Sequence, residues 1–139
     1  MEAIIPYLTF EGNAREAFAF YAQALDGEIA HLQTFGEVNP ECDAADKDRV
    51  MHAVFKAGEL TLMTSDTRSS DHPVQKGEMI SLSINFTEEL TINKTYKALS
   101  DGATIVMPLQ DTFWNARFGI LKDRFGIQWM FNYDKPKND

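Results

Sequence analysis

The chain has 139 residues, which suits one compact domain or two small fused modules and excludes separate cofactor and substrate domains. Its 44% hydrophobic, 12% aromatic and 24% charged residues are close to globular averages and exclude wholesale disorder. With 13 Lys and Arg against 21 Asp and Glu, the formal net charge is −8, which repels phosphate backbones and anionic lipid, so we expect neither nucleic acid nor a membrane as partner.

Features that report on the cellular compartment point to the cytoplasm. The first residues, Met1 to Pro6, lack the basic region and long apolar stretch of a secretory signal. No apolar run approaches the ~20 residues that span a bilayer. The single cysteine, Cys42, cannot form an internal disulfide, which fits a reducing compartment.

The first half of the chain predicts a strand, a helix and three further strands. In chain order we expect these at residues 3–10, 14–25, 28–35, 49–56 and 59–64. Asn13 is the expected N-cap of the helix, and Gly27 is expected to end it in a left-handed conformation. The polar stretch 36–48 predicts a mobile loop.

The second half predicts the same order of elements. We expect them at residues 79–86, 88–100 (a helix capped by Thr87), 104–109, 113–121 and 127–133. The segments YAQALDG (21–27) and YKALSDG (96–102) can be overlaid with a one-residue slip, which indicates a duplication. The expected organisation is a first βαβββ module at 1–68, a linker at 69–78, a second module at 79–134 and a tail at 135–139.

Several short segments, in their order and spacing, resemble the PhnB-like branch of the glyoxalase/bleomycin-resistance/extradiol-dioxygenase (vicinal oxygen chelate) superfamily. They are Pro6 to Asn13 with Glu16-Ala17 and Phe20-Tyr21, Met51-His52-Ala53, Leu62-Met63 with Ser65-Asp66, Phe113-Trp114, Asp123 to Gly126, and Trp129. The chain departs from the family at Arg124, where the hairpin usually carries proline.

The resemblance implies an α+β fold. Two βαβββ modules would form a curved mixed sheet around a cleft, with the helices outside. It also implies a homodimer, because dimerisation is the habit of the family.

The resemblance further implies where a divalent metal would be held. The family's ligand positions fall on Pro6, on Leu62 or Met63, on Met79 and on Met130. None of these side chains is a ligand for a hard divalent ion, which needs N or O donors. We therefore expect no metal, and since P-loop and Gly-x-Gly-x-x-Gly motifs are absent we expect no cofactor.

His52 is the best polar candidate for a site, since its imidazole can act as acid, base or hydrogen-bond donor near neutral pH. It matches the family's histidine in this segment. The alternative is a structural histidine held by backbone or by a partner chain. We expect His31 at a strand edge and His72 in the linker, both outside a site.

Strand alternation divides the last strand between two faces. Ile127, Trp129, Phe131 and Tyr133 should face the helices, and Gln128, Met130 and Asn132 the concave side. An aromatic ring beside amides and thioethers is a common lining for a small organic ligand. The predicted ligand-binding residues are His52, Met63, Trp114, Asn115, Phe118, Gln128 and Met130. Trp114 can equally be a core or dimer contact, and the methionines plain packing residues.

Other motifs favour structural roles. The acidic stretch 37–48 lacks the ligand spacing of a calcium loop. Carboxylates surround Cys42 without a nearby cation, which makes it a poor nucleophile. Ser65-Asp66 lacks a Gly-x-Ser-x-Gly elbow and is interpreted as a strand-end turn.

The leading hypothesis is metal-independent binding of an unknown small organic molecule, oriented by His52, Asn115 and Gln128. The alternative is a divalent-metal-dependent lyase, isomerase or dioxygenase. A methyltransferase ranks last, because the chain has no Gly-rich strand-to-helix turn for adenosylmethionine. Whether any reaction is catalysed stays open.

Overall fold

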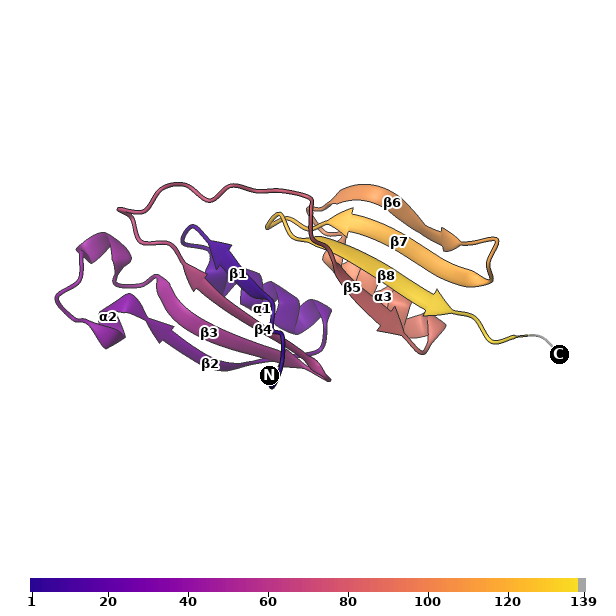
Figure 1. Ribbon diagram of the computed structural model, residues 1–139, viewed down its shortest axis with the longest axis horizontal. Helices are drawn as coiled ribbons and strands as arrows, with labels where there is room; N and C mark the ends of the chain where they lie inside the picture. Colours follow the sequence, from indigo (N-terminus) through magenta and orange to yellow (C-terminus); the bar gives the residue numbers. More distant parts are fainter. Residues whose placement is uncertain (138–139) are drawn as a thin grey trace. The chain divides into compact units, whose positions relative to one another are not determined.

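The computed structural model describes residues 1–137 and divides the chain into two units, with the boundary between Gln75 and Lys76. This boundary falls inside the expected linker, 69–78. Each unit has the α+β order of one βαβββ module, as expected (Figure 1). No helix in the described residues has the length and apolar character needed to cross a membrane.

Unit 1 folds into a four-stranded mixed sheet. Its elements are β1 (Tyr7–Phe10), α1 (Ala14–Ala24), β2 (Glu28–Thr34), α2 (Phe35–Val38), the 3-10 turn η1 (Ala44–Asp46), β3 (Val50–Ala57) and β4 (Leu60–Asp66). The strand order is β1-β4-β3-β2. The β1 and β4 strands are parallel, and the other neighbours are antiparallel.

Unit 2 repeats this topology. Its elements are β5 (Leu82–Phe86), α3 (Glu89–Leu99), β6 (Thr104–Asp111), β7 (Ala116–Lys122) and β8 (Gln128–Asp134). The strand order is β5-β8-β7-β6, with β5 parallel to β8. Identical strand order and direction in the two sheets support the duplication that the repeated sequence segments indicate.

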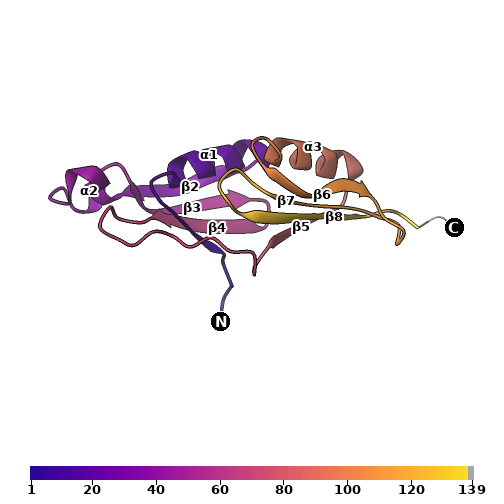
Figure 2. The same ribbon diagram turned by 90° about the horizontal axis from the view of Figure 1, so that it is seen from above.

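In each unit one helix covers one face of the sheet, as Figure 2 shows for α1 and for α3. Apolar residues of α1 recur every three or four positions and are buried, among them Phe18 and Tyr21. Phe18 packs on Phe55 of β3 with ring centroids 5.7 Å apart. Alternation along the strands therefore buries one set of side chains under the helix and leaves the other set on the opposite face.

The core of unit 2 follows the same rule. Trp129, Phe131 and Tyr133 alternate along β8 and are buried, as the sequence pattern predicts. The ring of Tyr96, on α3, meets Phe131 edge to face with centroids 5.1 Å apart. The β8 side chains between these residues are consequently on the face away from α3.

The helix starts agree only in part with expectation. Asn13 is the N-cap of α1 as expected, but its side chain makes no capping bond. The buried carboxylate of Asp66 accepts instead from the N–H groups of Gly12 (2.9 Å) and Ala14 (3.0 Å). The N-cap of α3 is Glu88 rather than Thr87, and it too makes no side-chain bond. A capping side chain supplied from a distant strand leaves no local sequence signal.

The expected loop at 36–48 is partly helical. Thr34 caps α2 by accepting a hydrogen bond from the Glu37 N–H, and η1 follows. Asp46 is buried and accepts from the Ser69 N–H at 2.8 Å. These bonds attach the polar stretch to the rest of the unit.

The helix ends explain the one-residue slip between the two repeats. In unit 1 the left-handed residue is Asp26, with φ of 54°, whereas in unit 2 it is Gly102, with φ of 75°. Gly27 is required for another reason: a Cβ there would lie 2.6 Å from the Lys56 carbonyl oxygen. The expectation that Gly27 supplies the left-handed turn is therefore wrong.

Several strand boundaries also differ from the sequence pattern. The first strand begins at Tyr7 rather than residue 3, and β5 begins at Leu82 rather than Met79, which is fully exposed. The β7 strand begins at Ala116, so Phe113 and Trp114 lie in the turn before it. The predicted strands are too long because apolar residues continue beyond the hydrogen-bonded part of each strand.

Candidate functional site

Each sheet has an open face, defined here as the face opposite its helix. Five of the seven predicted site residues lie on these open faces. His52 and Met63 lie on the open face of unit 1. Phe118, Gln128 and Met130 lie on the open face of unit 2. Trp114 and Asn115 lie in the turn before β7.

His52 is in β3. Ala53 and Phe55 of the same strand are buried under the helix, so His52 lies on the opposite face. Its Nδ1 lies 3.3 Å from the hydroxyl of Tyr7, and the two rings are stacked with centroids 6.0 Å apart. The ring of His31, on the neighbouring strand β2, lies 6.1 Å from that of His52. We call these three residues the Tyr7–His31–His52 cluster.

Sequence reasoning missed two members of this cluster. His31 does lie on the edge strand β2, as expected, but strand pairing brings it beside His52. For Tyr7 the sequence holds one signal, its alternation with Phe10, which is buried on the helix side. The cluster crosses β1, β3 and β2, so only the strand order assembles it.

Leu62 and Met63, the two candidates for one ligand position of the family, lie on opposite faces of β4. Leu62 is fully buried on the helix side of β4, whereas Met63 lies on the open face, paired with Tyr7 on one side and Val54 on the other. A thioether and a valine thus lie next to the Tyr7–His31–His52 cluster.

The open face of unit 2 is apolar and amide-bearing. Phe118 pairs with Asn132, and Met130 with Ile120. The Gln128 side-chain amide donates to the Ser81 hydroxyl at 2.8 Å. The Asn132 amide donates to Asp134 at 3.2 Å. This face offers amides and apolar surface.

The turn before β7 presents an exposed aromatic pair. Trp114 is 54% exposed and meets Phe113 edge to face with centroids 4.9 Å apart. Phe118 lies 6.4 Å from Trp114. Asn115 has φ of 64°, a conformation that asparagine tolerates in turns, and its amide donates to the Pro136 carbonyl at 3.4 Å. The side chain of Asn115 thus ties this turn to the segment after β8.

Asp66 has a structural role rather than a catalytic one. Its buried carboxylate accepts from three backbone N–H groups, those of Gly12, Ala14 and Val50. These bonds join the end of β4 to the start of α1 and to β3. Ser65 and Asp66 are the last two residues of β4 rather than a turn after it. Every hydrogen bond to the Asp66 carboxylate comes from the backbone.

Clearly shifted pKa values occur at other places in the molecule. Burial raises the pKa of Tyr96. Lys135 and then Arg117 lower the pKa of Asp111 by donating to its carboxylate. The N–H of Arg68 does the same for Asp71. These shifts accompany packing and surface ion pairs.

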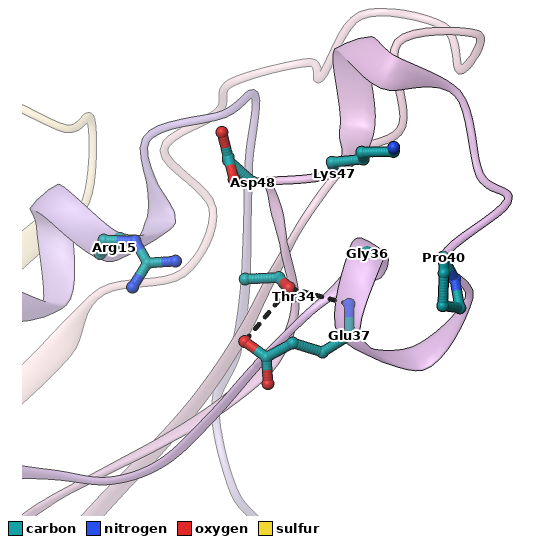
Figure 3. Close-up of a pocket in the computed structure, with 7 residues that line it drawn as sticks. All are labelled: Arg15, Thr34, Gly36, Glu37, Pro40, Lys47 and Asp48. Atoms are coloured by element: carbon teal, nitrogen blue, oxygen red, sulfur yellow. Dashed lines mark hydrogen bonds between the residues drawn. The ribbon is translucent and has the colours of Figure 1, made fainter.

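A separate hollow of about 430 Å³ lies in unit 1 beside α2 (Figure 3). It is lined by Arg15, Thr34, Gly36, Glu37, Pro40, Lys47 and Asp48. Two cations and two anions balance one another there, and Thr34 and Glu37 satisfy each other through bonds of 3.1 Å and 3.3 Å. None of the predicted ligand-binding residues lines this hollow.

The family's metal positions do not fit a divalent ion in this chain. Proline, two exposed or half-buried methionines at 79 and 63, and Met130 offer no nitrogen or oxygen side-chain donor. Within residues 1–137, no three His, Cys, Asp or Glu side chains gather closely enough to hold a metal.

Comparison with known proteins yields a family match over most of the chain. Residues 2–131 match the family described as 3-demethylubiquinone-9 3-methyltransferase. Protein YjdN of Escherichia coli K12 is 30% identical, covering 95% of each chain.

Two solved structures are similar in both sequence and fold. Protein PA1353 from Pseudomonas aeruginosa is 38% identical with a TM-score of 0.85, covering 98% of this chain and 100% of its own. A putative 3-demethylubiquinone-9 3-methyltransferase, PhnB protein, from Bacillus cereus is 27% identical with a TM-score of 0.82, covering 95% and 99%.

A more distant solved structure is similar in fold alone. A glyoxalase/bleomycin resistance protein/dioxygenase family enzyme from Burkholderia phytofirmans has a TM-score of 0.60 at 15% identity, covering 95% of this chain and 99% of its own.

Proposed function

The chain belongs to the 3-demethylubiquinone-9 3-methyltransferase family, whose PhnB-like members share the glyoxalase/bleomycin-resistance/dioxygenase fold, and on that premise we propose that it binds a small organic molecule without a resident metal ion. In unit 1 the residues that would contact this molecule are His52 and Met63. The residues of unit 2, Trp114, Asn115, Phe118, Gln128 and Met130, stay a prediction from the sequence.

The observation that carries the proposal is the pair of Tyr7 and His52 on an open sheet face beside Met63. Ligand sites combine a mainly apolar or aromatic lining with a few polar groups that fix orientation. Here two polar rings supply orientation, and the thioether supplies adaptable apolar surface. Metal independence is supported by the donor chemistry at Pro6, Met63, Met79 and Met130.

The methyltransferase in the family's description is not part of the proposal. Adenosylmethionine and nucleotides are commonly held at a glycine-rich turn before a helix N-terminus. In this chain the start of α1 is occupied by the protein's own Asp66 carboxylate, which accepts from Gly12 and Ala14. A second anion at the same N–H groups would meet that negative charge.

We further propose that the protein works in the cytoplasm as a homodimer. The lone Cys42 supports a reducing compartment. The exposed rings of Phe113 and Trp114 would suit a contact between copies, since aromatic residues are enriched in protein interfaces. Light scattering on the purified protein tests the homodimer. Trp114→Ala is expected to shift the equilibrium towards monomer, and a monomeric wild type would refute the homodimer.

The central test measures metal content and ligand binding together. The protein is purified without chelator, its metals are quantified by mass spectrometry, and its thermal shift is recorded with a panel of planar organic compounds, with and without EDTA. We expect substoichiometric metal and compound-induced stabilisation that EDTA leaves unchanged.

Matched variants complete the test. His52→Ala should weaken binding without changing metal content, and His72→Ala, which alters an exposed linker histidine, should change neither. Stoichiometric metal that is lost in His52→Ala would overturn the proposal and favour the divalent-metal-dependent lyase, isomerase or dioxygenase.

A further inference from the structure

The Tyr7–His31–His52 cluster gathers hydrogen-bond donors on the open face of unit 1. The side chains on that face come from all four strands. They are Tyr7 and Thr9 of β1, Glu28, His31 and Gln33 of β2, His52, Val54 and Lys56 of β3, and Thr61, Met63 and Ser65 of β4. Most of the polar groups among them can donate a hydrogen bond.

We propose that the Tyr7–His31–His52 cluster is a subsite for an anionic group of the ligand, a carboxylate on a small apolar body. This inference rests on the proposed binding function and names the chemical class of its ligand. The cluster would bind the carboxylate most tightly when its imidazoles are protonated.

The hydrogen bond between Tyr7 and His52 fixes which atoms can meet the ligand. When the Tyr7 hydroxyl donates to Nδ1 of His52, the imidazole proton is on Nε2, which then donates outwards. When His52 is protonated, both ring nitrogens donate, and the phenol oxygen of Tyr7 becomes the acceptor. In both states His52 presents a donor, and in the second state it adds a positive charge.

The charges around the cluster favour an external anion. Glu28 is the one carboxylate on this face among the strand residues of unit 1, and in the β2–β3 register it is opposite Lys56 at the far end of the pair. Within residues 1–137 neither His31 nor His52 forms an ion pair with a carboxylate. Protonated imidazoles here would have no carboxylate counterion among the described residues.

The apolar neighbours define the rest of the ligand. Tyr7, Met63, Val54 and His31 form one row across the sheet, since Tyr7 pairs with Met63, Met63 with Val54 and Val54 with His31. Tyr7 and His31 are thus at the two ends of this row, and Met63 and Val54 lie between them. An aromatic or aliphatic body against this pair, with its carboxylate towards the histidines, satisfies both kinds of surface.

The test compares two probes of matched shape that differ in charge, benzoate and benzamide. The protein is labelled with ¹³C in its histidines, and because there are three, the resonances of His31, His52 and His72 are assigned with single variants. Binding is followed at about pH 5 and about pH 8, the range in which imidazole changes its charge.

We expect benzoate to shift the His31 and His52 resonances and to bind about tenfold more tightly at the lower pH, as a charge-assisted hydrogen bond predicts. Benzamide should bind equally at both pH values.

Variants separate the roles of the three residues. His52→Gln keeps a donor but should reduce the pH dependence of benzoate binding, and His31→Gln combined with His52→Gln should abolish it. Tyr7→Phe should weaken benzoate binding severalfold and leave its pH dependence in place. His72→Gln is the control and should match the wild type. Thermal melts confirm that each variant is folded.

Equal, pH-independent binding of both probes would overturn the anionic subsite and leave the proposed binding function standing. The absence of any benzoate effect on His31 and His52 would overturn it as well. Failure of the proposed function itself is recognised separately, by the metal content and the compound panel.

Discussion

Unit 1 presents ionisable rings on its open face, Tyr7, His31 and His52, whereas the open face of unit 2 presents Phe118, Met130 and the amide of Asn132. Both faces belong to sheets of the same strand order. The buried faces are similar, because each must pack under one helix. The difference teaches that a duplicated module keeps its packed side, where changes of volume are costly, while the open side diverges.

Asp66 of unit 1 and Asp123 of unit 2 are both buried, and they differ in how far along the chain their hydrogen-bond donors lie. Asp66 accepts N–H groups far away in sequence, from Gly12 and Ala14. Asp123 accepts from Phe125, Ile127 and the indole of Trp129, all within one hairpin. One carboxylate fixes tertiary structure, and the other fixes a local turn.

The largest effect should follow from removing these carboxylates. Asp66→Ala should lower the free energy of unfolding by about 3–5 kcal/mol, because it leaves buried N–H groups without acceptors. Asp123→Ala should cost less, about 2–3 kcal/mol, because backbone bonds from Gly126 to Asp123 and from Asp123 to Ile127 still close the hairpin.

Urea unfolding followed by circular dichroism measures both values. The fluorescence of Trp114 and Trp129 reports on unit 2 alone, since both tryptophans are in it. Asp43→Ala, at an exposed carboxylate, is the control. A cost for Asp123→Ala equal to that for Asp66→Ala would remove the distinction between long-range and local anchoring.

The next largest effect on the free energy of unfolding is expected at the glycines after α1 and α3, and it should differ between the two. Gly27→Ala should cost about 2–3 kcal/mol, because its Cβ would overlap the Lys56 carbonyl. Gly102→Ala should cost about 1–2 kcal/mol from left-handed strain, as φ there is 75°. Asp26→Gly should instead stabilise, since φ at Asp26 is 54°. Thermal unfolding ranks the three variants, and a smaller cost at Gly27 than at Gly102 would contradict the steric account.

A smaller effect is expected at the hairpin of unit 2. Arg124, which replaces the family's usual proline, bonds Asp101 at 2.6 Å and ties the hairpin to the end of α3. Exposed ion pairs contribute about 0.2–1 kcal/mol, so Arg124→Ala should lose an amount in that range. Gly58, in the corresponding hairpin of unit 1, has φ of 56°. The variant Gly58→Ala measures the cost of left-handed strain in a hairpin that lacks the Arg124–Asp101 ion pair. A double-mutant cycle with Asp101→Ala isolates the pair, and a coupling energy of zero would show that the ion pair is not the cause.

The smallest effect concerns the exposed ion pairs of Asp111. Lys135 and Arg117 lower its pKa, so its stabilising contribution is present above the ordinary value of 3.8 and is lost as the pH falls through the lower value in the folded state. Asp111→Asn should slightly lower the urea midpoint at neutral pH. The difference from wild type should vanish at about pH 2, and a difference that persists there would show that the carboxylate charge is not its cause.

Sequence reasoning recovered the element order and much of the alternation. It assigned Trp129, Phe131 and Tyr133 to the helix side, because their period of two is a local property of the strand. It placed His52 in a strand for the same reason. It assigned the capping of α1 to Asn13, because Asp66, the residue that provides it, is 52 positions away from Ala14.

The amino-acid sequence by itself determined the duplicated α+β modules, the apolar faces of the helices and the absence of metal-binding side chains at the family's ligand positions. Only the tertiary structure decided that Tyr7 and His31 join His52, that Met63 rather than Leu62 is on the open face, and that Asp66 anchors α1. Periodicity acts over neighbouring residues, whereas a contact across β1, β4, β3 and β2 depends on strand order and register, which distant parts of the chain fix together.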